Sequence, residues 1–408
     1  MKIFKIMAVA LVAMLGFNSC SEDCDHEFIE HDFTQELVGT WTYDEGEQAE
    51  AIEINPDGSF TITGVMKYGA LYEEKGSIKV VNNKVTLAYN SGDVFEGRLE
   101  LVAGKSLSIV LFEEENIRLT YDYCKEDLSD EIIGMWVCTD APTENGEAMI
   151  VHSFMDNGKA TYTGFGTYVD EYLVKKETTY EVVGDLLFYA LPKDKLAEGE
   201  DSYITKKLAY RPNGIAYGDI MEEKTIKSTS TMLRIKQSLD LNIDKKYDYS
   251  SVYISNAKGS DFTIMDYTFD ASKADGSRLD AMLKHLLFCV EFPTPNTIKY
   301  KYRYNDNDVP FEAPITVDGN KVTIDMTVIN SAYRKVDMYM FQDADNSQLH
   351  MYMPTSGFIN YFANIQLTAL NAEGKIDLGD TAAVEKVFAD LDACVESINV
   401  SFVMKARK

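Results

Sequence analysis

The chain has 408 residues, of which 66 are Asp or Glu and 39 are Lys or Arg, so its formal net charge is -27 at pH 7. So acidic a protein is repelled by phosphate backbones, which makes nucleic acid a poor partner. A hydrophobic fraction of 45% argues against bulk disorder, and the length predicts two or three domains.

The chain opens with the pattern of an export signal. Two lysines precede an apolar run over residues 6–17, which is too short to span a bilayer as a stable helix. The pair Ser19-Cys20 that follows resembles the lipobox of bacterial lipoproteins, in which the cysteine is lipidated and becomes the mature N-terminus. The resemblance implies a signal peptide over residues 1–19 and an acyl anchor on Cys20 that holds the protein to a membrane.

An acidic stretch over residues 20–35 follows the signal. It resembles the tether of surface-exposed lipoproteins of Gram-negative bacteria, which implies an outer-membrane protein displayed on the cell surface. The alternative is a solvated linker with no sorting role. No later segment of the sequence approaches the length of a membrane span, so the acyl anchor is the expected membrane contact.

The middle of the chain contains an internal repeat. Leu-Val-Gly-Thr-Trp at 37–41 corresponds to Ile-Ile-Gly-Met-Trp at 132–136, and the two tryptophans of the chain occupy equivalent positions. Each copy continues with an alternating strand, a turn that ends in Asp-Gly or Asn-Gly, and an aromatic strand. Short alternating runs separated by such turns predict antiparallel sandwiches or barrels.

Both copies resemble lipocalin-like, or calycin-like, domains. In that family a Gly-x-Trp element places the indole at the closed end of a barrel, and an arginine near the last strand packs over it. Trp41 and Trp136 end the two Gly-x-Trp elements, and Arg118 and Arg234 stand where the packing arginine is expected. The resemblance implies two barrels closed by these Trp–Arg pairs. The alternative is two filled barrels whose tryptophans are core residues.

The C-terminal part has a different pattern, with hairpins, strands and about three helices expected near residues 279–286, 354–365 and 380–397. The expected fold is therefore mainly β, with tandem small antiparallel lipocalin-like barrels followed by an α+β barrel-like domain. The expected segments are the signal peptide 1–19, the tether 20–35, a first barrel domain 36–125, a second barrel domain 130–240 and the C-terminal domain 245–408.

Catalytic motifs are missing from the sequence. It has no zinc-protease helix, nucleophile elbow, phosphate-binding loop or dinucleotide fingerprint. Asp343, Asp345 and Ser347 have the alternate spacing of a calcium loop, but Gln348 stands where that loop needs glycine, so a hairpin turn is expected. We expect no enzyme, no cofactor and no metal site, and the sequence carries no signal for an oligomeric state.

Five cysteines follow Cys20, and an odd number in an exported protein leaves at least one thiol unpaired. Two of them are expected to be small core residues, and two flank a domain junction where a disulfide is possible. The core pair is Cys289 and Cys394, the junction pair is Cys124 and Cys138, and Cys24 lies in the tether with its pairing open.

The C-terminal domain is rich in tyrosine, phenylalanine and methionine, which are favoured on adaptable ligand surfaces. The candidate ligand-binding residues are Tyr300, Tyr302, Tyr304, Met340, Met351, Met353, Phe358, Tyr361 and Phe362. The alternative is a core plugged by a helix, which we favour because such stripes more often build cores.

The expected function is non-enzymatic binding of a small amphipathic molecule or a glycan, in a lipocalin-like barrel or in the C-terminal domain. This expectation rests on the lipid anchor, the repeated units and the lack of catalytic motifs. The alternative is a structural or adhesive surface protein with filled barrels whose outer faces bind other proteins. The barrel interiors separate the two, because binding needs an interior that a ligand can reach.

Overall fold

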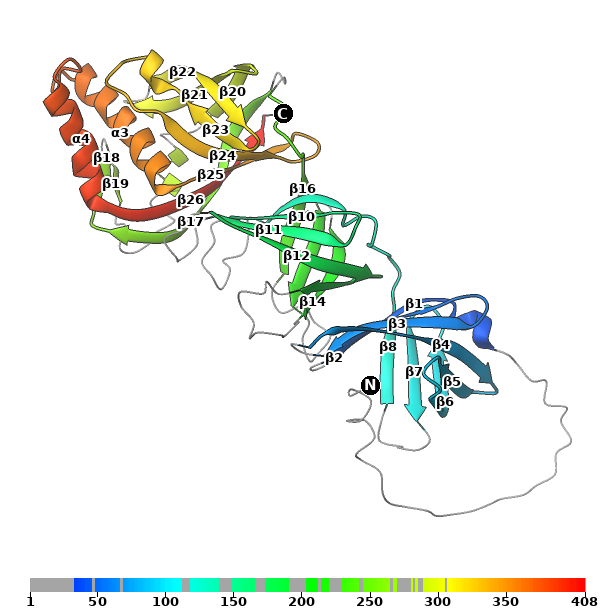
Figure 1. Ribbon diagram of the computed structural model, residues 1–408. Helices are drawn as coiled ribbons and strands as arrows, with labels where there is room; N and C mark the ends of the chain where they lie inside the picture. The colour runs from blue at the N-terminus through cyan, green and yellow to red at the C-terminus, as the bar shows by residue number, and fades with distance from the viewer. Residues whose placement is uncertain are drawn as a thin grey trace, which may run out of the picture. The chain divides into compact units, whose positions relative to one another are not determined.

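The computed structural model describes residues 33–407, with gaps at 46–47, 67–68, 112–117, 139–148, 166–172, 191–202, 212–213, 220–228, 242–244, 265–266, 270–279, 282, 285–288 and 305–306. The predictions for the signal peptide, for Cys20 and for most of the acidic tether lie outside the described residues. The described chain is mainly β and forms three closed barrels of eight antiparallel strands each (Figure 1). Within these residues, no helix combines the length and the apolar character needed to cross a bilayer.

Barrel 1 closes from eight consecutive strands, each paired with the next and the last paired with the first. The short helix η1 (Phe33–Leu37) precedes them. The strands are β1 (Gly39–Glu45), β2 (Gln48–Ile54), β3 (Ser59–Met66), β4 (Leu71–Val81), β5 (Lys84–Tyr89), β6 (Val94–Val102), β7 (Ser106–Leu111) and β8 (Arg118–Tyr123).

Local turn chemistry explains this up-and-down order. Asn82 and Asn83 join β4 to β5 with φ angles of 48° and 66°, the left-handed pair that a two-residue hairpin turn of type I′ requires and that asparagine tolerates. Between β2 and β3, the Asp57 carboxylate accepts a hydrogen bond from the backbone N–H of Ser59. Tight turns of this kind place consecutive strands side by side, and strand alternation then points every second side chain into the barrel.

Barrel 2 repeats the design with β9 (Gly134–Cys138), β10 (Met149–Phe154), β11 (Lys159–Phe165), β12 (Leu173–Val183), β13 (Leu186–Ala190), β14 (Tyr203–Arg211), β15 (Gly214–Asp219) and β16 (Thr229–Ile235). Its opening strands have the register of barrel 1. Trp41 pairs with Ile52 across β1 and β2, and Trp136 pairs with His152 across β9 and β10. The sequence repeat is therefore a repeat of strand pairing as well.

Barrel 3 is closed by β26 pairing with β17, and the short hairpin of β18 (Phe262–Ile264) and β19 (Tyr267–Phe269) forms a separate sheet. The barrel strands are β17 (Lys246–Gly259), β20 (Cys289–Thr294), β21 (Thr297–Tyr304), β22 (Asn307–Asp318), β23 (Lys321–Ile324), β24 (Val336–Gln342), β25 (Gln348–Met353) and β26 (Val395–Ala406).

Two α-helices of three or more turns are described in this part of the chain, fewer than the three or so expected: α3 (Thr355–Ala372) and α4 (Thr381–Cys394). Asp380 caps α4 by accepting hydrogen bonds from the backbone N–H groups of Ala382 and Ala383. Of the helix expected near residues 279–286, the structure describes four residues, 280, 281, 283 and 284, and all four are helical. The third expected helix ends early, because residues 395–397 pair in β26 rather than continuing α4.

The chain divides into two compact units. Residues 1–132, 179–209 and 217–228 belong to the first, and residues 133–178, 210–216 and 229–408 to the second. In the first unit, the apolar cluster of Ala51, Val65, Val183, Leu186 and Phe188 joins barrel 1 to β12 and β13. In the second unit, outer residues of β9, β10 and β11 pack on β24 and β25 through Val137, Met149, Val151, Phe165, Phe341 and Tyr352.

Candidate functional site

The candidate residues in barrel 3 are part of its packed core. Seven of the nine have side chains that are at most 1% exposed: Tyr300, Met340, Met351, Met353, Phe358, Tyr361 and Phe362. The Tyr300 ring lies 5.4 Å from Phe311 and 5.3 Å from Tyr361 on α3, and its hydroxyl donates to the sulfur of Met326. For Tyr302 and Tyr304 the strand is described but the side chains are not.

Helix α3 explains why this aromatic and methionine stripe is closed to ligands. It packs against β24, β25 and β26, and ten of its residues are buried. Gly357 brings the helix backbone so close to β24 that an added Cβ would lie 2.3 Å from the carbonyl oxygen of Asp337. The aromatic and methionine stripe is therefore part of a core filled by a helix, which is the alternative to a ligand surface.

The Trp–Arg pairs differ between the two repeats. In barrel 2 the Arg234 guanidinium lies 4.9 Å from the Trp136 ring centre, within cation–π reach, and donates to the carbonyl oxygen of Ile133. In barrel 1 the expected partner is wrong. Arg118 lies on the outer face in an ion pair with Glu100, whereas the ring of Tyr123 packs edge-on against Trp41 at 5.0 Å.

Strand register gives the reason for this correction. The residue opposite Trp136 in β16 is Arg234, and the residue opposite Trp41 in β8 is Tyr123. Arg118 stands five positions earlier in β8, which at about 3.3 Å per residue places it far along the strand from the tryptophan. The lid position of barrel 1 is thus occupied by a tyrosine.

One end of barrel 1 is sealed. Trp41 is 1% exposed, and its indole N–H donates to the carbonyl oxygen of Leu37 in η1 at 2.7 Å. The hydroxyl of Thr34 accepts from the backbone N–H of Val80, and the Gln35 side chain donates to the carbonyl oxygen of Pro56. Helix η1 therefore covers this end and fixes the orientation of the indole.

Farther from Trp41, inward positions of the same barrel carry polar side chains. Glu50 faces inward from β2 and is 5% exposed. Its carboxylate accepts a hydrogen bond from the hydroxyl of Tyr72 at 2.7 Å and another, on its second oxygen, from the hydroxyl of Tyr121. The ring of Tyr43 lies 5.6 Å from that of Tyr121. We refer to Tyr43, Glu50, Tyr72 and Tyr121 as the Glu50 cluster.

Further aromatic and acidic side chains face inward beside this cluster. Glu74 follows Tyr72 at the next inward position of β4, and the ring of Tyr89 lies 5.6 Å from that of Phe95. These side chains are partly exposed, in contrast to the sealed end of the barrel. The rings of Tyr72, Tyr89 and Phe95 pack against the apolar cluster inside barrel 1.

The charge of Glu50 reaches this whole group. Burial, followed by the charge of Glu50, raises the pKa of the Tyr121 hydroxyl well above its usual value. The same two causes raise the pKa of Tyr89 and of the Glu74 carboxyl. The hydroxyls therefore stay protonated at neutral pH and act as hydrogen-bond donors toward the carboxylate.

Barrel 2 shows that this fold does not require the Glu50 cluster. Glu50 lies opposite Tyr43 and Gly64, and the matching pairs in barrel 2 join Ile150 to Cys138 and to Gly164. Met232 stands two positions before Arg234, as Tyr121 stands two positions before Tyr123, so Met232 takes the position of Tyr121. The two barrels thus differ at three inward positions of one register, where barrel 1 has Tyr43, Glu50 and Tyr121 and barrel 2 has Cys138, Ile150 and Met232.

The Glu50 cluster is not among the sites that the sequence predicts, although the sequence contains a signal for it. The run Ala-Glu-Ala-Ile-Glu-Ile over residues 49–54 alternates, and Glu50 falls on the same face as Ile52 and Ile54. A carboxylate on the apolar face of a predicted strand indicates a buried charge that needs partners. The partners Tyr72 and Tyr121 are 22 and 71 residues away, and pairing them requires the closed barrel.

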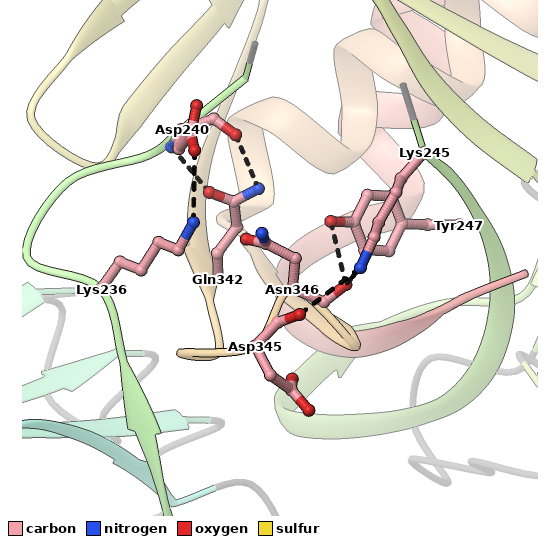
Figure 2. A network of polar contacts seen from close by, with 7 residues as sticks. All are labelled: Lys236, Asp240, Lys245, Tyr247, Gln342, Asp345 and Asn346. Atoms are coloured by element: carbon pink, nitrogen blue, oxygen red, sulfur yellow. Dashed lines mark hydrogen bonds and ion pairs between the residues drawn. The ribbon is translucent and has the colours of Figure 1, made fainter. Parts of the chain in front are cut away.

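A second polar network, in the second unit, has a structural role (Figure 2). The Gln342 side chain accepts from the backbone N–H of Asp240 at 2.7 Å and donates to its carbonyl oxygen at 3.0 Å. Lys245 and Tyr247 both donate to the carbonyl oxygen of Asn346, at 3.0 and 3.4 Å. These contacts tie β17 and the segment before it to the end of β24 and the turn that follows it.

The turn between β24 and β25 is a hairpin turn, as its sequence predicts. The Asp343 carboxylate accepts from the Ser347 hydroxyl and from the backbone N–H of Gln348, and Asn346 has a φ of 59°. The described residues contain no group of three or more His, Cys, Asp or Glu arranged to hold a metal ion. The Cys124 thiol donates to the carbonyl oxygen of Glu126, and Cys289 is buried in β20 as a reduced thiol.

No model of a known protein family matches the sequence, and no curated protein matches it significantly.

Proposed function

We propose that this protein is a lipid-anchored protein of the outer membrane, displayed on the cell surface, that binds a small amphipathic molecule or a glycan without transforming it. The binding site is the interior of barrel 1, at the end that carries the Glu50 cluster, and barrels 1 and 2 are lipocalin-like domains. The anchor is the acylated Cys20 and the acidic segment after it is the tether, as their resemblance to bacterial lipoproteins implies.

The observation that carries this proposal is the contrast between the interiors of barrels 1 and 2. Both close with one register, yet Glu50 and Tyr121 in barrel 1 stand where barrel 2 has Ile150 and Met232. A buried carboxylate with two phenol donors costs desolvation that an apolar set avoids. Because folding does not demand this set, ligand binding is the use that best accounts for it.

The shape of barrel 1 supports the same use. An eight-stranded barrel is just large enough to be filled by side chains or to hold one small ligand. Trp41 and η1 seal one end, and the inward residues Tyr72, Glu74 and Tyr89, farther from that end, are partly exposed. An apolar interior with a few converging polar groups is the usual composition of a small-molecule site.

The alternative, a structural or adhesive protein, is favoured by a different observation on a different part of the chain. The interior of barrel 3 is a packed core that includes α3. We therefore assign barrel 3 to the scaffold, with its outer faces available to other proteins, and place ligand binding in barrel 1.

Native mass spectrometry of the full-length chain with lipids, bile acids and glycans tests the proposal. The variant Gly64→Ala is the blocking variant, because a Cβ there would lie 2.5 Å from the Tyr72 hydroxyl oxygen and 2.8 Å from the Cβ of Glu50. Gly164→Ala, at the matching position of barrel 2, is its control.

We expect a ligand that stays bound to the wild-type and Gly164→Ala chains and is lost from Gly64→Ala. Ligand-free spectra for every class of compound, with no thermal shift, would overturn the proposal. Loss of a ligand from Gly164→Ala and retention in Gly64→Ala would move the site to barrel 2.

A further inference from the structure

In the second unit, the outer faces of barrels 2 and 3 meet through an apolar contact. The ring centre of Phe165 on β11 lies 5.1 Å from that of Tyr339, 5.6 Å from that of Phe341 and 5.1 Å from that of Tyr352. Outward aliphatic side chains of barrel 2 extend the contact around these rings: Val137, Met149, Val151 and Ile235. We refer to these eight residues as the barrel 2–3 joint.

His350 of β25 is buried in this joint. It pairs with Phe341 in β24 and stands two positions before Tyr352, so strand alternation points its side chain toward barrel 2 and away from the interior of barrel 3. The residue is 0% exposed, and neither ring nitrogen has a hydrogen-bond partner among the described residues. Buried polar atoms are normally paired, so an unpartnered imidazole in an apolar contact needs a reason.

The groups that face the histidine from barrel 2 and from β17 do not balance a positive charge. The phenol of Tyr253 on β17 is neutral below about pH 10. Asp248, farther along β17, is held in an ion pair with Arg407. The described side chains of β9, β10, β11 and β16 that pack on this face are aliphatic or aromatic: Met135, Val137, Met149, Val151, Phe165, Leu233 and Ile235.

The groups on barrel 3 offer little more. Asp343 of β24 is the carboxylate closest in register to the histidine, but it already accepts hydrogen bonds from the Ser347 hydroxyl and the backbone N–H of Gln348. Burial raises the pKa of the Asp343 carboxyl, so acid removes this negative charge readily. Asp337, farther along β24, is paired with Lys321. The other titratable groups on this face are cationic or neutral at neutral pH: Lys405, Tyr339 and Tyr352.

Protonation of His350 therefore opposes the contact. Burial lowers the pKa of His350 from 6.5 to about 4 while the barrels are in contact, and separation returns it toward the ordinary value. The contact keeps its full stability above pH 6.5. Below it, the separated form takes up the proton first, so the equilibrium for separation rises ten-fold per pH unit, or about 300-fold by pH 4. The raised pKa of Asp343 acts in the opposite sense.

We propose that the barrel 2–3 joint is an acid-sensitive switch, in which protonation of His350 separates the two barrels while each barrel stays closed. The contacts in Figure 2 form the hinge, because the Gln342 amide holds the backbone of Asp240 and an amide does not titrate in this range. The switch lies in the second unit and does not depend on the ligand site proposed for barrel 1.

Small-angle X-ray scattering in line with size-exclusion chromatography tests the switch on the full-length chain, from about pH 7.5 to about pH 4. We expect the radius of gyration to rise as the pH falls below about 6 and to return on neutralisation. Far-UV circular dichroism should stay unchanged over the same range, because the strand ladders of the separated barrels persist.

Three variants assign the response to one residue. His350→Leu removes the titrating group and should keep the chain compact over the whole range. His350→Gln, polar but unable to take up a proton, should do the same and replaces it if His350→Leu does not fold. His152→Ile is the matched control, since His152 is buried opposite Trp136 inside barrel 2, at the position that Ile52 has opposite Trp41 in barrel 1. It should expand as the wild type does.

Three results would overturn the switch. A wild-type chain that stays compact at about pH 4 would show that protonation does not separate the barrels. Expansion of the His350 variants at the same pH as the wild type would assign the response to other groups. Loss of the far-UV signal together with expansion would show that the barrels unfold instead of separating.

Discussion

Barrels 1 and 2 have the same strand register and different interiors. Each opens with a Gly-x-Trp strand, each glycine has φ near +135°, and each tryptophan is buried opposite a residue of β2 or β10. At the inward positions nearer the other end, barrel 1 carries a carboxylate with two phenols and barrel 2 carries Ile150 and Met232. The two barrels therefore share the residues around the tryptophan and differ in the inward side chains farther from it.

The residues that cover the two tryptophans also differ between the barrels. Tyr123 in barrel 1 and Arg234 in barrel 2 occupy one register position and both pack on the tryptophan. An added Cβ on Gly39 would lie 2.9 Å from the Tyr123 ring, whereas on Gly134 the nearest atom of Arg234 is 3.7 Å away. Aromatic packing and cation–π stacking are thus interchangeable solutions for the same cover.

The largest expected effect comes from the tryptophans that the two barrels share. Trp41→Ala and Trp136→Ala should each lower the free energy of unfolding by about 3–5 kcal/mol, because each removes a buried aromatic side chain. Chemical denaturation followed by circular dichroism measures the loss. A loss in one barrel that is several-fold smaller than in the other would break the equivalence of the two closed ends.

The next effect concerns the Glu50 cluster, which barrel 2 lacks. The double variant Tyr72→Phe/Tyr121→Phe leaves the buried carboxylate without two donors and should cost about 2–4 kcal/mol of stability. Adding Glu50→Met removes the acceptor as well and should recover most of that loss, since removing both partners can be nearly neutral. Urea denaturation of the double and triple variants measures the difference, and a triple variant less stable than the double would contradict this account.

Alkaline pH provides a smaller contrast between the barrels. The pKa of Tyr121 is raised in the folded chain by burial and by the charge of Glu50, and its counterpart Met232 does not titrate. Above pH 10 the unfolded chain loses the phenol proton of Tyr121 while the folded chain keeps it. The free energy of unfolding therefore falls as the pH rises above 10. Between about pH 10 and pH 11 the loss is at most about 1.4 kcal/mol. Tyr121→Phe should reduce this loss, as measured by urea denaturation at the two pH values, and an identical slope would contradict the prediction.

The smallest effect separates the two arginines. Arg234→Ala should cost about 0.5–1 kcal/mol, because it removes a cation–π contact from a partly hydrated site. Arg118→Ala should change stability by less than about 0.5 kcal/mol, because an exposed ion pair contributes little. Thermal unfolding of both variants measures the difference. Equal losses would mean that Arg118 supports Trp41 after all.

Much of the fold was predictable from local pattern. Alternating strands, turns that end in Asp-Gly or Asn-Gly and the repeated Gly-x-Trp element predict antiparallel barrels, and the structure has them. The helix around Phe358 was predicted from its apolar spacing. These features depend on neighbours within a few residues, which is why a sequence reveals them.

Features that depend on register were predicted poorly. The lipocalin resemblance implies Arg118 as the residue that covers Trp41, but the alignment of β8 with β1 places Tyr123 opposite Trp41 instead. A shift along a strand exchanges every partner, and local pattern does not specify that alignment. The candidate residues of barrel 3 show a related difficulty, because a stripe of Tyr and Met can line either a binding site or a core. In the structure α3 packs on this stripe, so it forms part of the core.

By itself, the sequence determined the strands, their turns and the repeat, because these follow from side-chain periodicity and from the φ angles that glycine and asparagine allow. The tertiary structure decided which ends of the barrels are sealed and which side chains meet inside them. Glu50, Tyr72 and Tyr121 come from three strands that are far apart in sequence. Barrel closure brings them together, and the free energy of that contact exists only once the strands have paired.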